Sequence, residues 1–226
     1  MIKRVHIICE GQTEEMFVNE VLSQHLAEFN VVPIASLVGK PGRKGGLVTT
    51  ERMEYDVRLR LLQDDKAWCT TLFDFYGLDK DFVGKSEAIC KSSFQEKAEI
   101  IESALREYIL NKTNDGAIRR FFPYVQMYEF EGLLFSDPEK LASGLCSKKL
   151  EKDFCLIRKK FNSPEEINDS KETAPSKRIL DLMPRYEKPL HGSLAAIEIG
   201  LNAIRRECKR FDAWISWLEN PILVLR

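Results

Sequence analysis

The chain has 226 residues, of which 44% are hydrophobic and 31% are charged, and its formal net charge is −1 at pH 7. This length and composition are typical of a soluble globular protein with one large domain. The near-zero net charge excludes a global field that attracts nucleic acid or a membrane, so any polyanion site has to be a local patch. The apolar run after "MIKR" is too short for a signal peptide, and no later stretch approaches a membrane-spanning length.

Six cysteines are scattered along the chain without a C-x-x-C motif or paired histidines, which argues against structural zinc and against a disulfide framework. Cys9 and Cys69 lie in apolar, strand-like runs, where a free cysteine acts as a small hydrophobic residue. We therefore expect a cytoplasmic protein with reduced thiols and no membrane partner.

Strand-like and helix-like segments alternate in the first half of the chain. Strands are predicted at residues 4–10, 31–39, 67–77 and 121–131, and helices at about 13–29, 49–64 and 92–112. This order indicates an α/β fold with a mostly parallel sheet of four strands or slightly more, flanked by helices.

The pattern becomes helical beyond Leu133. Helices are predicted at about 137–144, 149–160, 176–183 and 193–218. The polar connector 162–178 is rich in turn formers and predicts an exposed loop. The simplest organisation is a single compact unit, with an α/β core at 1–135 and a helical C-terminal extension packed on it at 136–226.

Acidic residues follow three of the predicted strands. They are Glu10, Glu14 and Glu15 after the first strand, Asp74 at the end of the third, and Glu129 and Glu131 at the end of the fourth. Ligands of open parallel sheets bind outside the carboxyl ends of the strands, so we expect these carboxylates to converge there. A divalent cation would relieve their repulsion, and oxygen-only ligands favour Mg²⁺ or Mn²⁺. Such a centre would activate water for phosphodiester cleavage.

A purely structural interpretation stays open for these residues. Glu14 and Glu15 lie in a first helical turn, where the helix dipole favours acids and Thr13 can act as the cap. Asp74 could cap the turn that follows it, and Gly11 could serve only a sharp strand-to-helix turn.

The stretch "EGQTEE" after a hydrophobic strand resembles the first motif of TOPRIM domains, especially that of OLD-type (overcoming lysogenisation defect) nucleases. The resemblance implies a Rossmann-like fold with Glu10 and Glu14 as catalytic metal ligands. A later TOPRIM strand ends in Asp-x-Asp; here Asp74 matches the first acid, whereas Tyr76 stands at the place of the second. Glu129 or Glu131 would then have to supply the missing ligand.

The whole chain is more closely similar to domain-of-unknown-function family 4276. The matching stretches are "EGQTEEMFV", "TLFDFYGL", "YEFEGLLFSDP", "APSKRI" and "HGSLAAIEIGLNAIRRECKRFDAWI". That family is considered TOPRIM-like, has no established activity, and tends to occur beside genes for AAA/ABC-type ATPases in phage-defence settings. The resemblance therefore implies an ATPase of that type as a partner.

The loop "GKPGRKGG" is a candidate nucleic-acid contact, because it carries Lys40, Arg43 and Lys44 after the second predicted strand. It lacks the spacing of a P-loop. A flexible basic loop near a metal centre could hold a phosphate of a nucleic acid. The alternative, given equal weight, is that this is a solvated surface loop without a ligand.

Lys177 and Arg178 begin a predicted helix after a proline, where the helix dipole mildly disfavours cations, and this indicates a partner anion. Resemblance to OLD-type nucleases makes Lys177 the candidate catalytic lysine, and a salt bridge to one of the acids is the alternative. His191 could contact a phosphate or act as a turn or capping residue.

The sequence thus supports a Mg²⁺- or Mn²⁺-dependent nuclease that acts on DNA or RNA, with an ATPase partner. The alternative is a catalytically degenerate binding or regulatory subunit of an ATPase complex, because the second Asp of the TOPRIM pattern is missing. Phosphotransfer or hydrolysis on a nucleotide is a third reading, and a homo-oligomer is compatible with the sequence.

Overall fold

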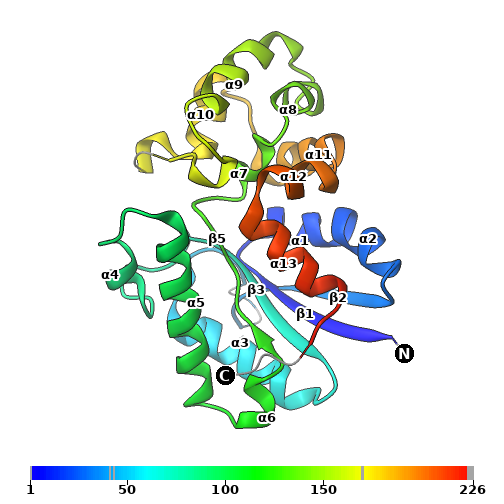
Figure 1. Cartoon of the computed structure of the whole chain (residues 1–226), viewed down its shortest axis with the longest axis vertical. Helices are drawn as coiled ribbons and strands as arrows, with labels where there is room; N and C mark the ends of the chain where they lie inside the picture. Colours follow the sequence, from blue (N-terminus) through cyan, green and yellow to red (C-terminus); the bar gives the residue numbers. More distant parts are fainter. Residues whose placement is uncertain (1, 41, 43, 169–170, 223–226) are drawn as a thin grey trace.

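A parallel sheet forms the centre of the computed structural model, which describes residues 2–40, 42, 44–168 and 171–222 (Figure 1). The strand order is β2-β1-β3-β4, and β5 also pairs with β3. The strands are β1 (Lys3–Cys9), β2 (Val31–Leu37), β3 (Trp68–Asp74), β4 (Phe121–Phe122) and β5 (Val125–Gln126). The predicted Rossmann-like α/β class with a parallel sheet is confirmed.

The register places the ends of three strands at one edge. In the pairing of β1 with β2, Cys9 lies opposite Leu37, and in the pairing of β1 with β3 it lies opposite Leu72. Residues that follow these positions therefore leave the sheet side by side. Glu10, directly after β1, and Asp74, the last residue of β3, lie at this edge.

The fourth predicted strand is interrupted. Pro123 separates β4 from β5, and the side chain of Thr71 bridges the break by accepting from Tyr124 N–H (3.0 Å) and donating to Tyr124 O (2.8 Å). Proline lacks the N–H group that a ladder needs, which explains the gap. The strand also ends at Gln126, so the prediction of a strand through residue 131 is wrong beyond that point.

Helices cover both faces of the sheet (Figure 1). The elements on one face are α1 (Gln12–Phe17), the π-helical η1 (Val18–Leu22), α2 (Ser23–Ala27) and α13 (Lys209–Glu219), and those on the other are α3 (Thr50–Gln63), α5 (Phe94–Leu110) and α6 (Asp115–Ile118). Val5 and Ile7 of β1 pack into the first layer and Ile8 into the second, as the two-residue period of a strand requires. Cys9 and Cys69 are free and buried, as predicted.

The helices predicted in the first half are confirmed, although α1, η1 and α2 share the first of them. Thr49 and Ser93 cap α3 and α5 with their side chains. A short helix that the sequence did not predict, α4 (Lys85–Ala88), precedes α5.

Most of the C-terminal helices stack beyond the carboxyl edge of the sheet (Figure 1). They are α7 (Glu131–Leu134), α8 (Pro138–Gly144), η2 (Lys148–Leu150), α9 (Glu151–Arg158), η3 (Pro164–Glu166), η4 (Lys171–Thr173), α10 (Pro175–Leu182), α11 (Lys188–Ile199) and α12 (Leu201–Glu207). The single helix predicted at 193–218 is wrong. Gly200, with φ at 80°, and Cys208 divide that region into α11, α12 and α13.

The last helix returns to the sheet and shares its core. Trp214 of α13 is 1% exposed, donates from Nε1 to Oγ1 of Thr70 in β3 (3.0 Å), and stacks on Tyr124 at a centroid distance of 4.7 Å. Trp217 stacks on Phe122 at the same distance. Among the helices of the described residues, none combines the length and the apolar character that crossing a membrane requires.

Candidate functional site

Acidic side chains from three chain segments meet at the carboxyl edge of the sheet. They are Glu10 after β1, Glu14 in α1, Asp74 at the end of β3, and Glu129 and Glu131 at the start of α7. We call these five residues the acid cluster. Three of them, Glu14, Asp74 and Glu131, are at most 6% exposed.

Glu10 and Asp74 are joined directly. Oε2 of Glu10 accepts a hydrogen bond from the backbone N–H of Asp74 at 3.0 Å. Oδ1 of Asp74 in turn accepts from the N–H of Phe130 at 2.8 Å, between Glu129 and Glu131. Two backbone N–H groups, that of Asp74 in β3 and that of Phe130 after β5, therefore link Glu10 to Asp74 and Asp74 to the start of α7.

Glu14 combines a structural role with a place in the cluster. Its Oε2 accepts from Gly11 N–H at 2.8 Å, which is the N3 half of a capping box at the start of α1. The structural interpretation is thus confirmed for Glu14, whereas the prediction of Thr13 as the cap is wrong, because Gly11 occupies the N-cap position and Thr13 lies inside α1. Its charge nevertheless raises the pKa values of both Glu10 and Asp74.

Gly77 leaves the space that the Glu10 carboxyl group occupies. A Cβ atom at Gly77 would lie 1.9 Å from Oε2 and 2.2 Å from Oε1 of Glu10. Atoms cannot approach so closely, so any side chain at position 77 would displace the carboxylate. The sequence "DFYG" contains this glycine, but nothing local to it indicated a contact with residue 10.

Lys188 is a cation that contacts two members of the acid cluster. Its Nζ lies 3.4 Å from Oε1 of Glu129 and 3.2 Å from Oε2 of Glu131. Oε1 of Glu131 also accepts from the Tyr186 hydroxyl at 3.4 Å, and Oε2 of Glu129 accepts from Ser176 N–H at 2.9 Å. Sequence reasoning missed Lys188, although it is a cation in the first turn of a helix, the same signal that singled out Lys177.

Burial and mutual repulsion change the pKa values of the cluster. Burial, and then the charge of Glu14, raises the pKa of Glu10 to about 8, and burial together with Glu131 raises that of Glu14 to about 7. Burial followed by the charges of Glu10 and Glu14 raises the pKa of Asp74 well above its ordinary value. The cluster therefore retains protons in a pH range where separate carboxylates are ionised.

The pKa of Lys188 changes in the opposite sense to what burial alone would give. Burial lowers the pKa of an amine, but the negative charges of Glu131, Asp74 and Glu129 outweigh that effect and raise it. Lys188 therefore stays charged and neutralises part of the cluster.

The donor set of the cluster fits a hard divalent cation, because it consists of carboxylate oxygens without His or Cys. Among residues 2–40, 42, 44–168 and 171–222, however, no group of three or more His, Cys, Asp or Glu side chains is placed so that it could hold a metal ion. The oxygens bind N–H groups and Lys188 instead. The chemistry of the donors thus suits Mg²⁺ or Mn²⁺, and their side chains would have to rotate to bind it.

Tyr76 lies two residues after Asp74, at the position where the resemblance to TOPRIM domains would place a second Asp. Its hydroxyl donates to Oδ1 of Asn168, and burial raises its pKa to about 12. The phenol is therefore neutral at physiological pH and does not replace a carboxylate.

The basic candidates of the C-terminal half lie outside the cluster. Lys177 is exposed on α10, and in the described part of the chain no hydrogen bond or ion pair connects it to the five acids. Arg178 donates from Nε to Thr173 O (2.7 Å), and its guanidinium lies 5.3 Å from the ring centroid of Phe161. Nδ1 of His191 accepts from Glu187 N–H (2.8 Å).

The glycine-rich loop is attached beside Glu10. Gly46 N–H donates to Glu10 O at 3.1 Å, and Val38 N–H donates to Cys9 O at 2.9 Å. Lys40 and Lys44 are exposed on this loop, whereas Arg43 lies outside the described residues. The loop thus places two lysines near the carboxyl edge of the sheet.

A comparison with protein families identifies the chain. The family model described as "Domain of unknown function (DUF4276)" matches residues 9–219, a span that contains the acid cluster and Lys188. Neither the curated proteins nor the solved structures gave a match. The chain therefore belongs to the family of the domain of unknown function DUF4276.

Proposed function

We propose that this protein is a Mg²⁺- or Mn²⁺-dependent nuclease whose site is the acid cluster. The observation that supports the proposal most is the hydrogen-bonded pair of Glu10 and Asp74 at the carboxyl edge, where burial and neighbouring charge raise the pKa of Glu10 to about 8. Carboxylates that are held together at such an energetic cost suit a doubly charged ligand.

Glu10, Glu14 and Asp74 would hold the ion, with Glu129 or Glu131 contributing. When bound, a divalent cation lowers the pKa of a coordinated water and neutralises charge on a phosphoryl oxygen. Lys188 would move from its carboxylate partners to the phosphate and stabilise the charge that develops there. Gly77 keeps the space in which the Glu10 carboxylate lies.

The proposal is tested by plasmid nicking with Mn²⁺ or Mg²⁺. Glu10→Gln and Asp74→Asn should abolish nicking while circular dichroism shows an unchanged fold, and Glu20→Gln, at an exposed position of η1, is the control. Retained cleavage in both cluster variants would remove the assignment. A panel of DNA, RNA and nucleotides then identifies the substrate.

The lysine of the site is tested in the same assay. Lys188→Met should lose nicking because Lys188 contacts two acids of the cluster, whereas Lys177→Met should retain it. The reverse result would restore Lys177 as the catalytic lysine and leave Lys188 with a structural role.

A second candidate function is a non-catalytic binding or regulatory subunit of an AAA/ABC-type ATPase complex in phage defence. The neutral Tyr76 and the pairing of Glu129 and Glu131 with Lys188 favour it. Titration calorimetry separates the two functions. Micromolar Mn²⁺ binding that Glu10→Gln abolishes supports the nuclease, and absence of Mn²⁺ binding supports the subunit.

A further inference from the structure

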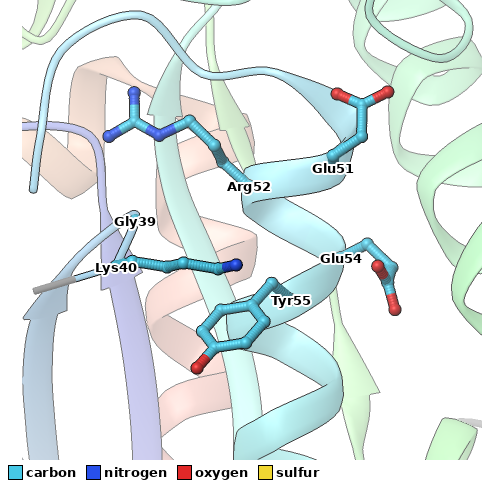
Figure 2. Close-up of a pocket in the computed structure, with 6 residues that line it drawn as sticks. All are labelled: Gly39, Lys40, Glu51, Arg52, Glu54 and Tyr55. Atoms are coloured by element: carbon cyan, nitrogen blue, oxygen red, sulfur yellow. The ribbon is translucent and has the colours of Figure 1, made fainter. Parts of the chain in front are cut away.

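A pocket of about 440 Å³ lies between the glycine-rich loop and α3 (Figure 2). Its lining residues are Gly39, Lys40, Glu51, Arg52, Glu54 and Tyr55. We propose that this pocket is a subsite for single-stranded nucleic acid, in which one base stacks on Tyr55 and the adjoining phosphate pairs with Lys40. The inference rests on the proposed function, which supplies the class of substrate.

The ring of Tyr55 is available for stacking. Nζ of Lys40 lies 5.1 Å from its centroid, and the Lys40 side chain that covers the ring is exposed (Figure 2). Stacking of a base on an aromatic ring is generally stronger than an exposed cation–π contact. A base can therefore take the place of the ammonium group, and Lys40 then reaches the phosphate of the same nucleotide.

The walls of the pocket are held in place before any ligand binds. The guanidinium of Arg52 donates to the carbonyl oxygens of Val38 (3.0 Å) and Gly45 (2.9 Å), which fixes both sides of the loop. Oδ2 of Asp56 accepts from Gly39 N–H at 2.6 Å. A preformed pocket loses less conformational entropy on binding than a free loop does.

The charges at the pocket favour a phosphate on the side of the loop. Lys40 lines the pocket, and Lys44 is exposed on the same loop. The carboxylates of Glu51 and Glu54 point away from Lys40 (Figure 2), and Glu54 forms an ion pair with Arg58 at 2.7 Å. The lysines therefore provide the local basic patch that a near-neutral protein needs to bind a polyanion.

The pocket is also within reach of the acid cluster. Lys40 is two residues from Val38, whose N–H donates to the carbonyl oxygen of Cys9, the residue before Glu10. The Cα atoms of Lys40 and Glu10 can therefore lie at most about 16 Å apart. A short oligonucleotide can bridge that distance. A strand whose base stacks on Tyr55 would consequently continue toward Glu10 and Asp74.

The test measures binding without cleavage. Fluorescence anisotropy with labelled oligothymidine or oligouridine in EDTA should show that Tyr55→Leu lowers the affinity by about 5- to 150-fold, the loss of one stacked base. Tyr55→Phe keeps the ring and should bind like the wild type. Lys40→Gln should reduce the slope of log K against log salt concentration by about 0.7, the contribution of one phosphate contact.

A control tyrosine of similar, intermediate exposure is Tyr108. Tyr108 lies near the end of α5, and Nζ of Lys112 is 5.6 Å from its ring centroid. The next helix, α6, lies at the end of the sheet opposite to α7–α12 (Figure 1). Tyr108→Leu should leave the affinity unchanged. An equal loss in Tyr108→Leu, or no loss in Tyr55→Leu, would overturn the subsite.

A second measurement covers the case in which Tyr55→Leu does not fold. A set of oligonucleotides is prepared, each with one abasic position at a different place along the strand. Those in which the missing base is the one that stacks on Tyr55 should bind the wild-type protein more weakly than the others. Equal affinity at every position, or equal competition by duplex DNA, would refute base stacking. The binding measurements are made in EDTA, without metal, so their outcome does not depend on cleavage. A wild-type protein that binds the oligonucleotide through this subsite but fails to nick DNA would refute the proposed nuclease function and not the subsite.

Discussion

The carboxylate of Glu10 accepts a hydrogen bond from the backbone N–H of Asp74, so an acidic side chain joins the ends of β1 and β3. The pairing of Cys9 with Leu72 in adjacent parallel strands brings the two residues into range. The charge of Glu10 raises the pKa of Asp74, after the larger effect of burial. Any change that moves the Glu10 carboxylate should therefore alter the whole cluster.

Gly77→Ala should displace the Glu10 carboxylate, because the new methyl group would lie about where its oxygens are. We expect a stability loss of about 1–3 kcal/mol, typical of overpacking, and weaker Mn²⁺ binding. Urea unfolding and calorimetry measure the two effects. Gly116→Ala is the control, since its Cβ would meet only Oδ1 of Asn114, at 3.3 Å. Unchanged Mn²⁺ affinity in Gly77→Ala would show that the position of Glu10 is irrelevant to metal binding.

The free energy of unfolding should fall as the pH rises from about 5 to 8. The pKa of Glu10 is raised from 4.5 to about 8 and that of Glu14 from 4.5 to about 7. The folded protein therefore binds more protons than the unfolded chain in this range. The stabilising contribution of the protonated Glu10 and Glu14 carboxyl groups is complete below pH 4.5 and is lost as the pH rises toward 8. Glu14 alone would account for at most about 3 kcal/mol.

Urea unfolding in EDTA at several pH values measures how the free energy of unfolding depends on pH. Subtracting the pH profile of Glu14→Gln from that of the wild type gives the contribution of Glu14. In a second series without EDTA, Mn²⁺ should restore stability at pH 8, because a cation neutralises the same carboxylates. A difference profile that is flat or rises with pH would contradict the raised pKa of Glu14.

Lys188→Met should destabilise the fold more at pH 8 than at pH 5. Glu131 is 1% exposed, and removal of its cationic partner leaves a buried charge that protonation can relieve only at low pH. Because 41% of the Lys188 side chain is exposed, we expect a loss of about 1–3 kcal/mol at pH 8. Lys177→Met, compared by urea unfolding at both pH values, should change little. Equal losses at the two pH values would indicate lost packing rather than lost charge.

Trp214→Phe should weaken the attachment of α13 to the sheet. The substitution removes the indole N–H that donates to Thr70 and reduces the stacking on Tyr124. We expect a loss of about 1–3 kcal/mol, since the Thr70 hydroxyl is fully buried. Thr70→Val in both backgrounds completes a double-mutant cycle, and additive losses would show that the two side chains do not interact.

The sequence was sufficient for the α/β class and for most of the elements. Strand and helix periods are properties of short stretches, so β1, β3, α3 and α5 were predicted from their own residues. Two of the errors fell where one residue interrupts a pattern, whereas α4 was missed and the fourth strand was predicted to extend beyond Gln126. Pro123 divides the fourth strand, and Gly200 ends α11, and neither break changes the hydrophobic pattern around it.

The sequence by itself also determined that acidic residues stand at the ends of the strands, because each acid is a close neighbour of its strand in the chain. Only the tertiary structure decided which groups meet those acids. Lys188, Tyr186 and Gly77 reach the cluster from segments far from Glu10 in the chain, through the packing of α11 and the turn after β3. Such contacts depend on how separate elements pack in space, and the residues of any one stretch do not specify that packing.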